Sequence, residues 1–173
     1  MKHTLLPLLL WTVVLSTASC VSEPDSQGDV VAVGDILPAF SVTDNSGQTV
    51  TPASLRDSVA VLVFFQTSCS DCRRELPAID AVRREFLQGG EAVRFLCISR
   101  AETAPTIADF WQQENLSLPY SAQETADVYR LFAERIIPRV YVADKHGHIR
   151  YSYAESVDGS SLKENIRYLL KNN

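Results

Sequence analysis

Two cysteines separated by two residues carry the chemistry that this sequence makes most evident. Cys69 and Cys72 stand in the stretch Cys-Ser-Asp-Cys, directly after an apolar run and at the start of a long helical pattern. The first turn of a helix has unpaired backbone N–H groups and the positive end of the helix dipole, and both stabilise a thiolate. The spacing therefore predicts a redox-active pair in which Cys69 attacks a disulfide and Cys72, one turn deeper, resolves the mixed disulfide.

Two other interpretations of the cysteine pair stay open at this point: an inert structural disulfide and one half of a zinc site. Zinc needs two further ligands, and the remaining candidates are Cys97, His146 and His148. The two histidines lie in or beside a turn, whereas Cys97 lies in an apolar strand, where a core role is expected. We therefore expect no metal and no cofactor other than the cysteine pair.

The segments around the cysteines alternate between strand and helix patterns. Residues 59–65 form a β-branched and aromatic run typical of a strand buried on both faces, and residues 70–88 have helical periodicity. Other strands are expected at residues 39–43, 48–51, 92–99, 139–143 and 148–153. Other helices are expected at residues 104–115, from Ser121 to Ala133, and from Ser161 onward; a Ser-x-x-Glu capping box begins each of the last two. The order predicts an α/β fold with a central mixed β-sheet flanked by helices.

The N-terminus has the pattern of an export signal. Residues 1–19 contain Lys2, an apolar run over residues 5–15 and then small residues, and are predicted to be a signal peptide. The run is shorter than the roughly 20 residues of a membrane span. Cys20 follows where bacterial lipoproteins carry their lipidated cysteine, so lipid attachment is favoured over ordinary cleavage after Ala18. We expect residues 20–33 to be a lipid-anchored flexible tether and residues 34–173 to be the folded domain.

Charge and export limit the range of partners. The net charge is −5 and no basic patch is evident, so a nucleic-acid partner is not expected. An exported chain works where cysteines tend to oxidise. We therefore place the protein in the periplasm or cell envelope, held to a membrane by the lipid.

The chemistry-bearing stretch also resembles a known family. Residues 64–77 are similar to the active-site strand and helix of thioredoxin-like thiol–disulfide oxidoreductases of the TlpA/ResA type, and Pro77 stands where that family has a helix-kinking proline. Residues 33–40 and 142–149 extend the likeness. The resemblance implies a thioredoxin-like fold with an N-terminal β-hairpin and a helical insertion before a cis-proline. It also implies reduction of disulfides in exported proteins, with electrons from an unidentified membrane or periplasmic donor.

The resemblance assigns roles to two residues far from the cysteines in the sequence. It implies that Pro138 is cis and faces the cysteines, and that the backbone of Ile137 pairs with a bound substrate. Without the family, a trans proline opening a strand would be favoured, because only about 5–6% of X–Pro bonds are cis.

Two acidic residues near the cysteines are candidates for tuning the chemistry. Glu75 shares a helix face with the cysteines and is a candidate for proton transfer, with a solvated helix residue as the alternative. The charge of Asp71 disfavours the Cys69 thiolate, which predicts a reducing potential nearer about −270 mV than about −120 mV. Arg73 and Arg74 are expected to point outward and to oppose this effect little.

Two further functions remain as alternatives. A peroxiredoxin-like thiol peroxidase shares the fold, but such enzymes usually have Thr or Ser three residues before the reactive cysteine, where this chain has Gln66. A non-enzymatic membrane-tethered binding module would keep the cysteines only as a structural disulfide.

Overall fold

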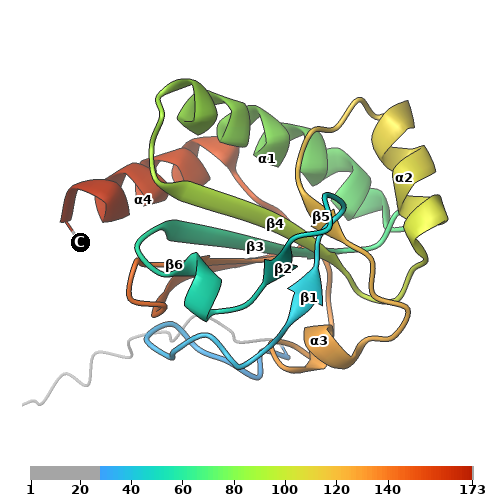
Figure 1. The fold of residues 1–173 in the computed structure, drawn as a ribbon, viewed down its shortest axis with the longest axis horizontal. Coiled ribbons are helices and arrows are strands. Elements are labelled where there is room, and N and C mark those ends of the chain that lie inside the picture. Colours follow the sequence, from blue (N-terminus) through green and yellow to red (C-terminus); the bar gives the residue numbers. More distant parts are fainter. Residues whose placement is uncertain (1–27, 173) are drawn as a thin grey trace, which may run out of the picture.

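The computed structural model describes residues 28–172 and contains a five-stranded mixed sheet (Figure 1). The strand order is β5-β4-β3-β6-β7; β4 runs parallel to β3 and β5, whereas β6 is antiparallel to both β3 and β7. The strands of this sheet are β3 (Val59–Phe65), β4 (Val93–Ser99), β5 (Tyr120–Ser121), β6 (Arg139–Ala143) and β7 (Ile149–Ala154). The remaining elements are the hairpin β1 (Val42–Thr43) and β2 (Thr49–Val50), the 3₁₀ turn η1 (Ala53–Leu55), and helices α1 (Ser70–Gln88), α2 (Ala104–Gln113), α3 (Asp127–Arg130) and α4 (Gly159–Asn172).

The central strand β3 is buried along its whole length, as its apolar run predicts. Its side chains alternate between the two faces of the sheet. Val61, Val63 and Phe65 join the core under α1, α2 and α4, while Leu62 and Phe64 join the core on the opposite face. The strand therefore has a hydrophobic layer on each side, and its C-terminal end leads directly to the cysteines.

Helices lie on both faces of the sheet, and the N-terminal segments share one face with α3. In Figure 1, α1 and α4 lie together on one face, while the β1–β2 hairpin and α3 lie on the other. This arrangement confirms the predicted thioredoxin-like fold, with a central mixed sheet flanked by helices and an N-terminal hairpin. The part of the chain that the structure describes has no helix that is long and apolar enough to cross a bilayer.

Residues 28–33, which the sequence places in the tether, are in contact with the folded domain. The signal peptide and Cys20 lie outside the described residues, but residues 28–33 pack onto the domain. Val31 is buried, and the Val30 backbone N–H donates to the Phe132 carbonyl oxygen over 2.9 Å. Asp29 forms an ion pair with Arg139 over 2.9 Å. The polar composition of this segment did not indicate that Asp29 forms a buried ion pair with Arg139.

The helix expected from Ser121 to Ala133 is wrong for most of its length. Ser121 belongs to β5, and its hydroxyl donates to the Thr43 carbonyl oxygen over 2.6 Å instead of capping a helix. Only α3 (Asp127–Arg130) is helical. Beyond it, the backbone N–H of Glu134 donates to the Gly28 carbonyl oxygen. Pairing with the N-terminal segment replaces the hydrogen bonds that a longer helix would have made.

The last helix begins earlier than its expected capping residue. The side chain of Asp158 accepts hydrogen bonds from the backbone N–H groups of Ser160 and Ser161, over 3.2 and 3.1 Å. Asp158 therefore acts as the N-cap of α4, because it satisfies donors that the helix itself leaves unpaired. Ser161 lies inside the first turn, where its hydroxyl donates to the same carboxylate.

Candidate active site

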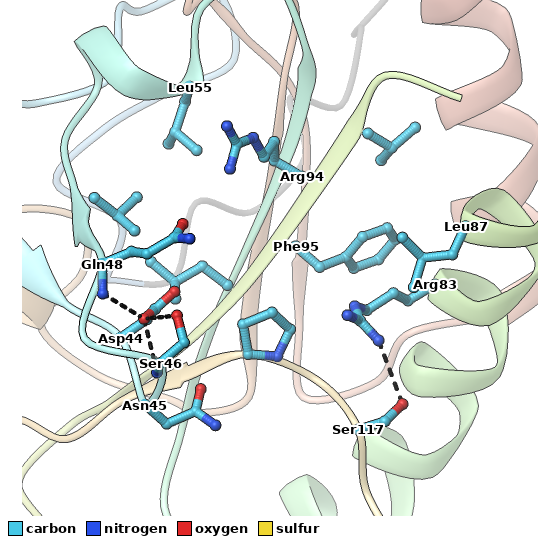
Figure 2. A pocket seen from close by; sticks show the side chains of 14 residues that line it. Asp44, Asn45, Ser46, Gln48, Leu55, Arg83, Leu87, Arg94, Phe95 and Ser117 are labelled. Carbon is cyan, nitrogen blue, oxygen red and sulfur yellow. Dashed lines mark hydrogen bonds between the residues drawn. The ribbon is translucent and has the colours of Figure 1, made fainter. Parts of the chain in front are cut away.

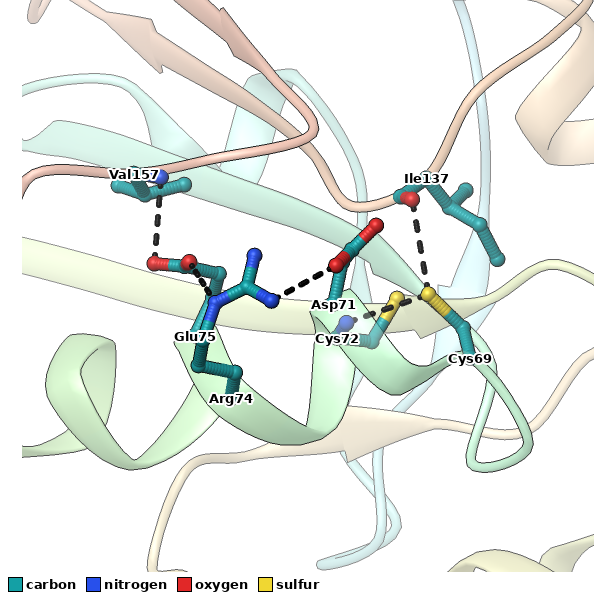
Figure 3. A network of polar contacts seen from close by, with 7 residues as sticks. All are labelled: Cys69, Asp71, Cys72, Arg74, Glu75, Ile137 and Val157. Carbon is teal, nitrogen blue, oxygen red and sulfur yellow. Dashed lines mark hydrogen bonds and ion pairs between the residues drawn. The ribbon is translucent and has the colours of Figure 1, made fainter.

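The two cysteines lie at the N-terminus of α1, directly after β3. Cys69 is the N-cap residue, and its Sγ accepts a hydrogen bond from the backbone N–H of Cys72 over 3.1 Å (Figure 3). This N–H is one of the donors that a helix leaves unpaired in its first turn. A donor aimed at sulfur stabilises the charged form, and the positive end of the helix dipole acts in the same direction. The first turn of α1 therefore aims one of its backbone donors at the Cys69 sulfur.

The two sulfurs differ in exposure. Both cysteines are free in this structure; Cys69 is half-buried, whereas Cys72 is fully buried. Burial raises the pKa of the Cys72 thiol, and its side-chain hydrogen bond with Cys69 raises it further. Cys69 is therefore the more accessible of the two sulfurs, and Cys72 lies beneath the surface.

The Ile137–Pro138 segment faces the cysteines from the other side of the site. The peptide bond is cis, the geometry that the family resemblance implied. The thiol of Cys69 donates to the Ile137 carbonyl oxygen over 3.5 Å (Figure 3). Folding thus joins two segments that are 68 residues apart in the chain.

The acidic residues of the site share one arginine. Arg74 binds the Asp71 carboxylate over 2.8 Å and the Glu75 carboxylate over 3.0 Å. Arg74 does point outward, as expected, with its side chain 59% exposed, but it also binds both carboxylates. Its positive charge offsets part of the field that Asp71 exerts on the cysteines. These contacts are drawn in Figure 3.

Glu75 is buried on the face of α1 that lies toward the sheet. Its second carboxylate oxygen accepts a hydrogen bond from the backbone N–H of Val157 over 3.2 Å. Val157 lies between β7 and α4, so the carboxylate joins α1 to the C-terminal part of the domain. The alternative of a solvated helix residue does not fit this environment.

One contact near the cysteines could not be found from the sequence pattern. Glu102 lies just before α2, and its carboxylate accepts hydrogen bonds from the Thr67 backbone N–H over 2.9 Å and from the Thr67 hydroxyl over 2.6 Å. Thr67 lies two residues before Cys69, so Glu102 holds the loop that leads to Cys69. No motif links the two, because 35 residues separate them.

Two surface pockets lie at different distances from this chemistry. A pocket of about 350 Å³ begins at Thr67 and Arg73 and continues along α2. Arg73 lies over the Phe110 ring, 5.0 Å from its centre, and pairs with Glu114 over 2.9 Å. A second pocket of about 370 Å³, lined by the β1–β2 turn, β4 and α1, contains no cysteine (Figure 2). Only the first adjoins the active-site loop.

The zinc interpretation requires side chains that the fold does not collect around the cysteines. Within residues 28–172, no group of three or more His, Cys, Asp or Glu side chains is arranged so that it could hold a metal ion. Cys97 is fully buried in β4, as a core residue would be, and burial raises the pKa of its thiol.

The chain is similar to several proteins of known sequence or structure. The chain is 22% identical over 146 residues to the thiol-disulfide oxidoreductase ResA of Bacillus cereus, covering 84% of this chain and 81% of that one. It is 25% identical over 136 residues to ResA of Geobacillus kaustophilus, covering 79% and 75%. A thio-disulfide isomerase from Thermus thermophilus superposes with a TM-score of 0.67 at 26% identity, covering 80% of this chain and 97% of that one. A thioredoxin family protein from Chlorobium tepidum, at 21% identity and a TM-score of 0.69 over 81% and 99%, supports the fold.

Fold, site and relatives together define a thioredoxin-like thiol–disulfide oxidoreductase. The model of the AhpC/TSA family matches residues 33–152, and the chain belongs to this family.

Proposed function

We propose that this protein reduces disulfide bonds in exported proteins, with Cys69 as the nucleophile and Cys72 as the resolving cysteine. The observation that supports these roles is the asymmetry of the pair. Cys69 is partly exposed, and its sulfur accepts a hydrogen bond from the backbone N–H of Cys72 at the helix N-terminus. Cys72 is buried, and the pKa of its thiol is raised.

The exchange proceeds in two steps. The Cys69 thiolate attacks one sulfur of the substrate disulfide, forming a mixed disulfide and releasing the other substrate sulfur as a thiolate, which takes up a proton. Cys72 then loses its proton and attacks the Cys69 sulfur, forming the Cys69–Cys72 disulfide and releasing the second substrate thiol. Two electrons pass from the protein to the substrate, and an unidentified membrane or periplasmic donor returns them.

Three neighbouring residues have proposed parts in these steps. The backbone of Ile137, before cis-Pro138, pairs with the substrate chain beside the attacked disulfide. Glu75 accepts the proton of Cys72 in the second step; its burial on the same helix, one turn further on, supports this. Asp71 favours a reducing potential, in part offset by Arg74. A midpoint potential above about −180 mV would contradict the reducing direction.

Trapping of the mixed disulfide tests the roles of the two cysteines. The Cys72→Ala variant should accumulate covalent adducts with exported proteins, visible on non-reducing gels and identified by mass spectrometry. Cys69→Ala should form none and should not reduce insulin with dithiothreitol. Cys97→Ala is the matched control, because it removes a buried cysteine outside the site; it should reduce insulin normally and, with Cys72 present, should accumulate no adducts.

Other outcomes would favour the alternatives. Insulin reduction that survives Cys69→Ser would indicate a binding module with a structural disulfide. Peroxide consumption that survives Cys72→Ala but not Cys69→Ala would indicate a thiol peroxidase.

The proposed location is the periplasm or cell envelope, with a lipid on Cys20. An export signal before Cys20 and the polar composition of residues 21–29 support this in the sequence. Metabolic labelling with a radioactive fatty acid should mark the wild-type protein and leave Cys20→Ser unlabelled; equal labelling of both would contradict the anchor.

A further inference from the structure

The loop that presents Ile137 to Cys69 has an unfavourable backbone conformation. Ile136 has a φ of 59°, in the left-handed region that β-branched residues rarely adopt. Such a conformation persists only where surrounding groups hold it. The carbonyl of the next residue, Ile137, is the group that contacts Cys69. Whatever holds Ile136 therefore determines how the substrate-pairing backbone meets the nucleophile.

Tyr129 in α3 is the side chain that contacts this loop from inside the domain. Its hydroxyl donates to the Arg135 carbonyl oxygen and lies 3.0 Å from the Ile136 carbonyl oxygen. The residue is only 1% exposed. Burial raises the pKa of the Tyr129 phenol above its ordinary value of 10, so the hydroxyl remains a protonated donor at neutral pH.

The Tyr129 ring is itself fixed in place. It packs edge-on against Phe64 of β3, with 5.7 Å between the ring centres, and the Arg100 guanidinium lies 5.0 Å from the ring centre on its face. A rigid ring therefore places the hydroxyl under two consecutive carbonyls of the loop.

We propose that Tyr129 is a positioning residue for protein substrates: its hydroxyl holds the Arg135 and Ile136 carbonyls, so that the Ile137 backbone is set to pair with the polypeptide around the target disulfide. This inference rests on the proposed function. It concerns recognition of a polypeptide backbone, so it predicts a different effect on peptide disulfides than on small disulfides that have no backbone.

The test compares two disulfides with two tyrosine variants. Reduced protein is mixed with a cyclic disulfide peptide or with hydroxyethyl disulfide, and the remaining protein thiols are counted by alkylation after an acid quench. Tyr129→Phe keeps the ring and removes the hydroxyl, and it should slow the reaction with the peptide about fivefold, the effect of one hydrogen bond. The reaction with hydroxyethyl disulfide should be unchanged.

Tyr141→Phe is the matched control. Tyr141 belongs to the same aromatic cluster and its hydroxyl is also hydrogen-bonded, but to Asp29 and to the Phe132 carbonyl, not to the loop at Ile136. Loss of the Tyr141 hydroxyl should leave the rates with both disulfides unchanged. Equal slowing of both disulfides in the two variants would mean a general loss of stability and would overturn the proposal.

A double variant provides a second readout that does not depend on the stability of Tyr129→Phe. Asparagine tolerates a positive φ far better than isoleucine. Adding Ile136→Asn to Tyr129→Phe should therefore restore most of the rate with the peptide. No recovery, or a normal rate in Tyr129→Phe alone, would overturn the positioning role. A wild-type protein that reduces neither disulfide would instead refute the proposed function.

Discussion

Replacing Asp29 by alanine is expected to destabilise the domain strongly, although this residue lies in a polar segment before the first strand. The Asp29 side chain is 9% exposed and the Arg139 side chain 3% exposed, with 2.9 Å between their charged atoms. Removing one partner from a buried ion pair costs about 3–5 kcal/mol, because the other charge stays in a poorly solvated place. The substitution also removes an acceptor from the Tyr141 hydroxyl.

The expected loss is large enough to measure by ordinary unfolding. For a domain of this size, about 3 kcal/mol lowers the melting temperature by about 10 °C. Urea unfolding followed by the fluorescence of buried Trp111 gives the free energy directly. A truncated chain that begins at Gly34 loses the same ion pair and should be destabilised at least as much.

Two further variants test whether the loss of stability comes from the burial of the ion pair or from charge pairing in general. Asp127→Ala breaks a pair with Arg130 in which the side chains are 75% and 67% exposed, and it should change stability little. Replacing both buried partners by apolar residues, Asp29→Leu with Arg139→Met, should recover much of the loss. If Asp29→Ala proves as mild as Asp127→Ala, the assignment of residues 28–33 to the folded domain is refuted.

Two other predictions concern proton transfer and acid stability. Glu75→Gln should lengthen the lifetime of the mixed disulfide at neutral pH about 100-fold or more without slowing the attack by Cys69, as measured by acid-quenched alkylation; a normal lifetime would exclude its proton-transfer role. Burial alone would raise the pKa of Asp144, but hydrogen bonds from the His148 backbone and the Arg150 side chain together lower it below 3.8. Because its folded-state pKa is depressed, the stability that it contributes is complete above the unfolded value and is lost as the pH falls through the folded value. Asp144→Asn should therefore flatten the acid side of the stability curve, and an unchanged slope would contradict this.

Local patterns determined the elements that carry the cysteines. The uninterrupted apolar run at residues 59–65 and the helical period from residue 70 predicted β3 and α1, and the structure confirms both. The Cys-x-x-Cys pair was therefore placed at a helix N-terminus without knowledge of the fold. These features depend on neighbours a few residues away, which is why they can be read from sequence.

Local patterns failed where distant partners compete for the same groups. The capping box at Ser121 predicts a helix if only residues close in sequence are considered. In the structure the Ser121 hydroxyl instead donates a hydrogen bond to the Thr43 carbonyl oxygen, 78 residues away. The polar residues before position 34 predict a tether, but Asp29 forms an ion pair with Arg139, 110 residues away. In each case a hydrogen bond or ion pair in the folded core replaced one that the local chain or water would have supplied.

Only the tertiary structure determined which groups surround Cys69. The sequence determined which sulfur lies at the start of the helix, because helix geometry is local. The contacts of Cys69 with the Ile137 carbonyl and of Thr67 with Glu102 depend on how β3, β6 and α2 pack together. Packing brings these groups within hydrogen-bonding distance across long stretches of chain, and no short-range pattern encodes that approach.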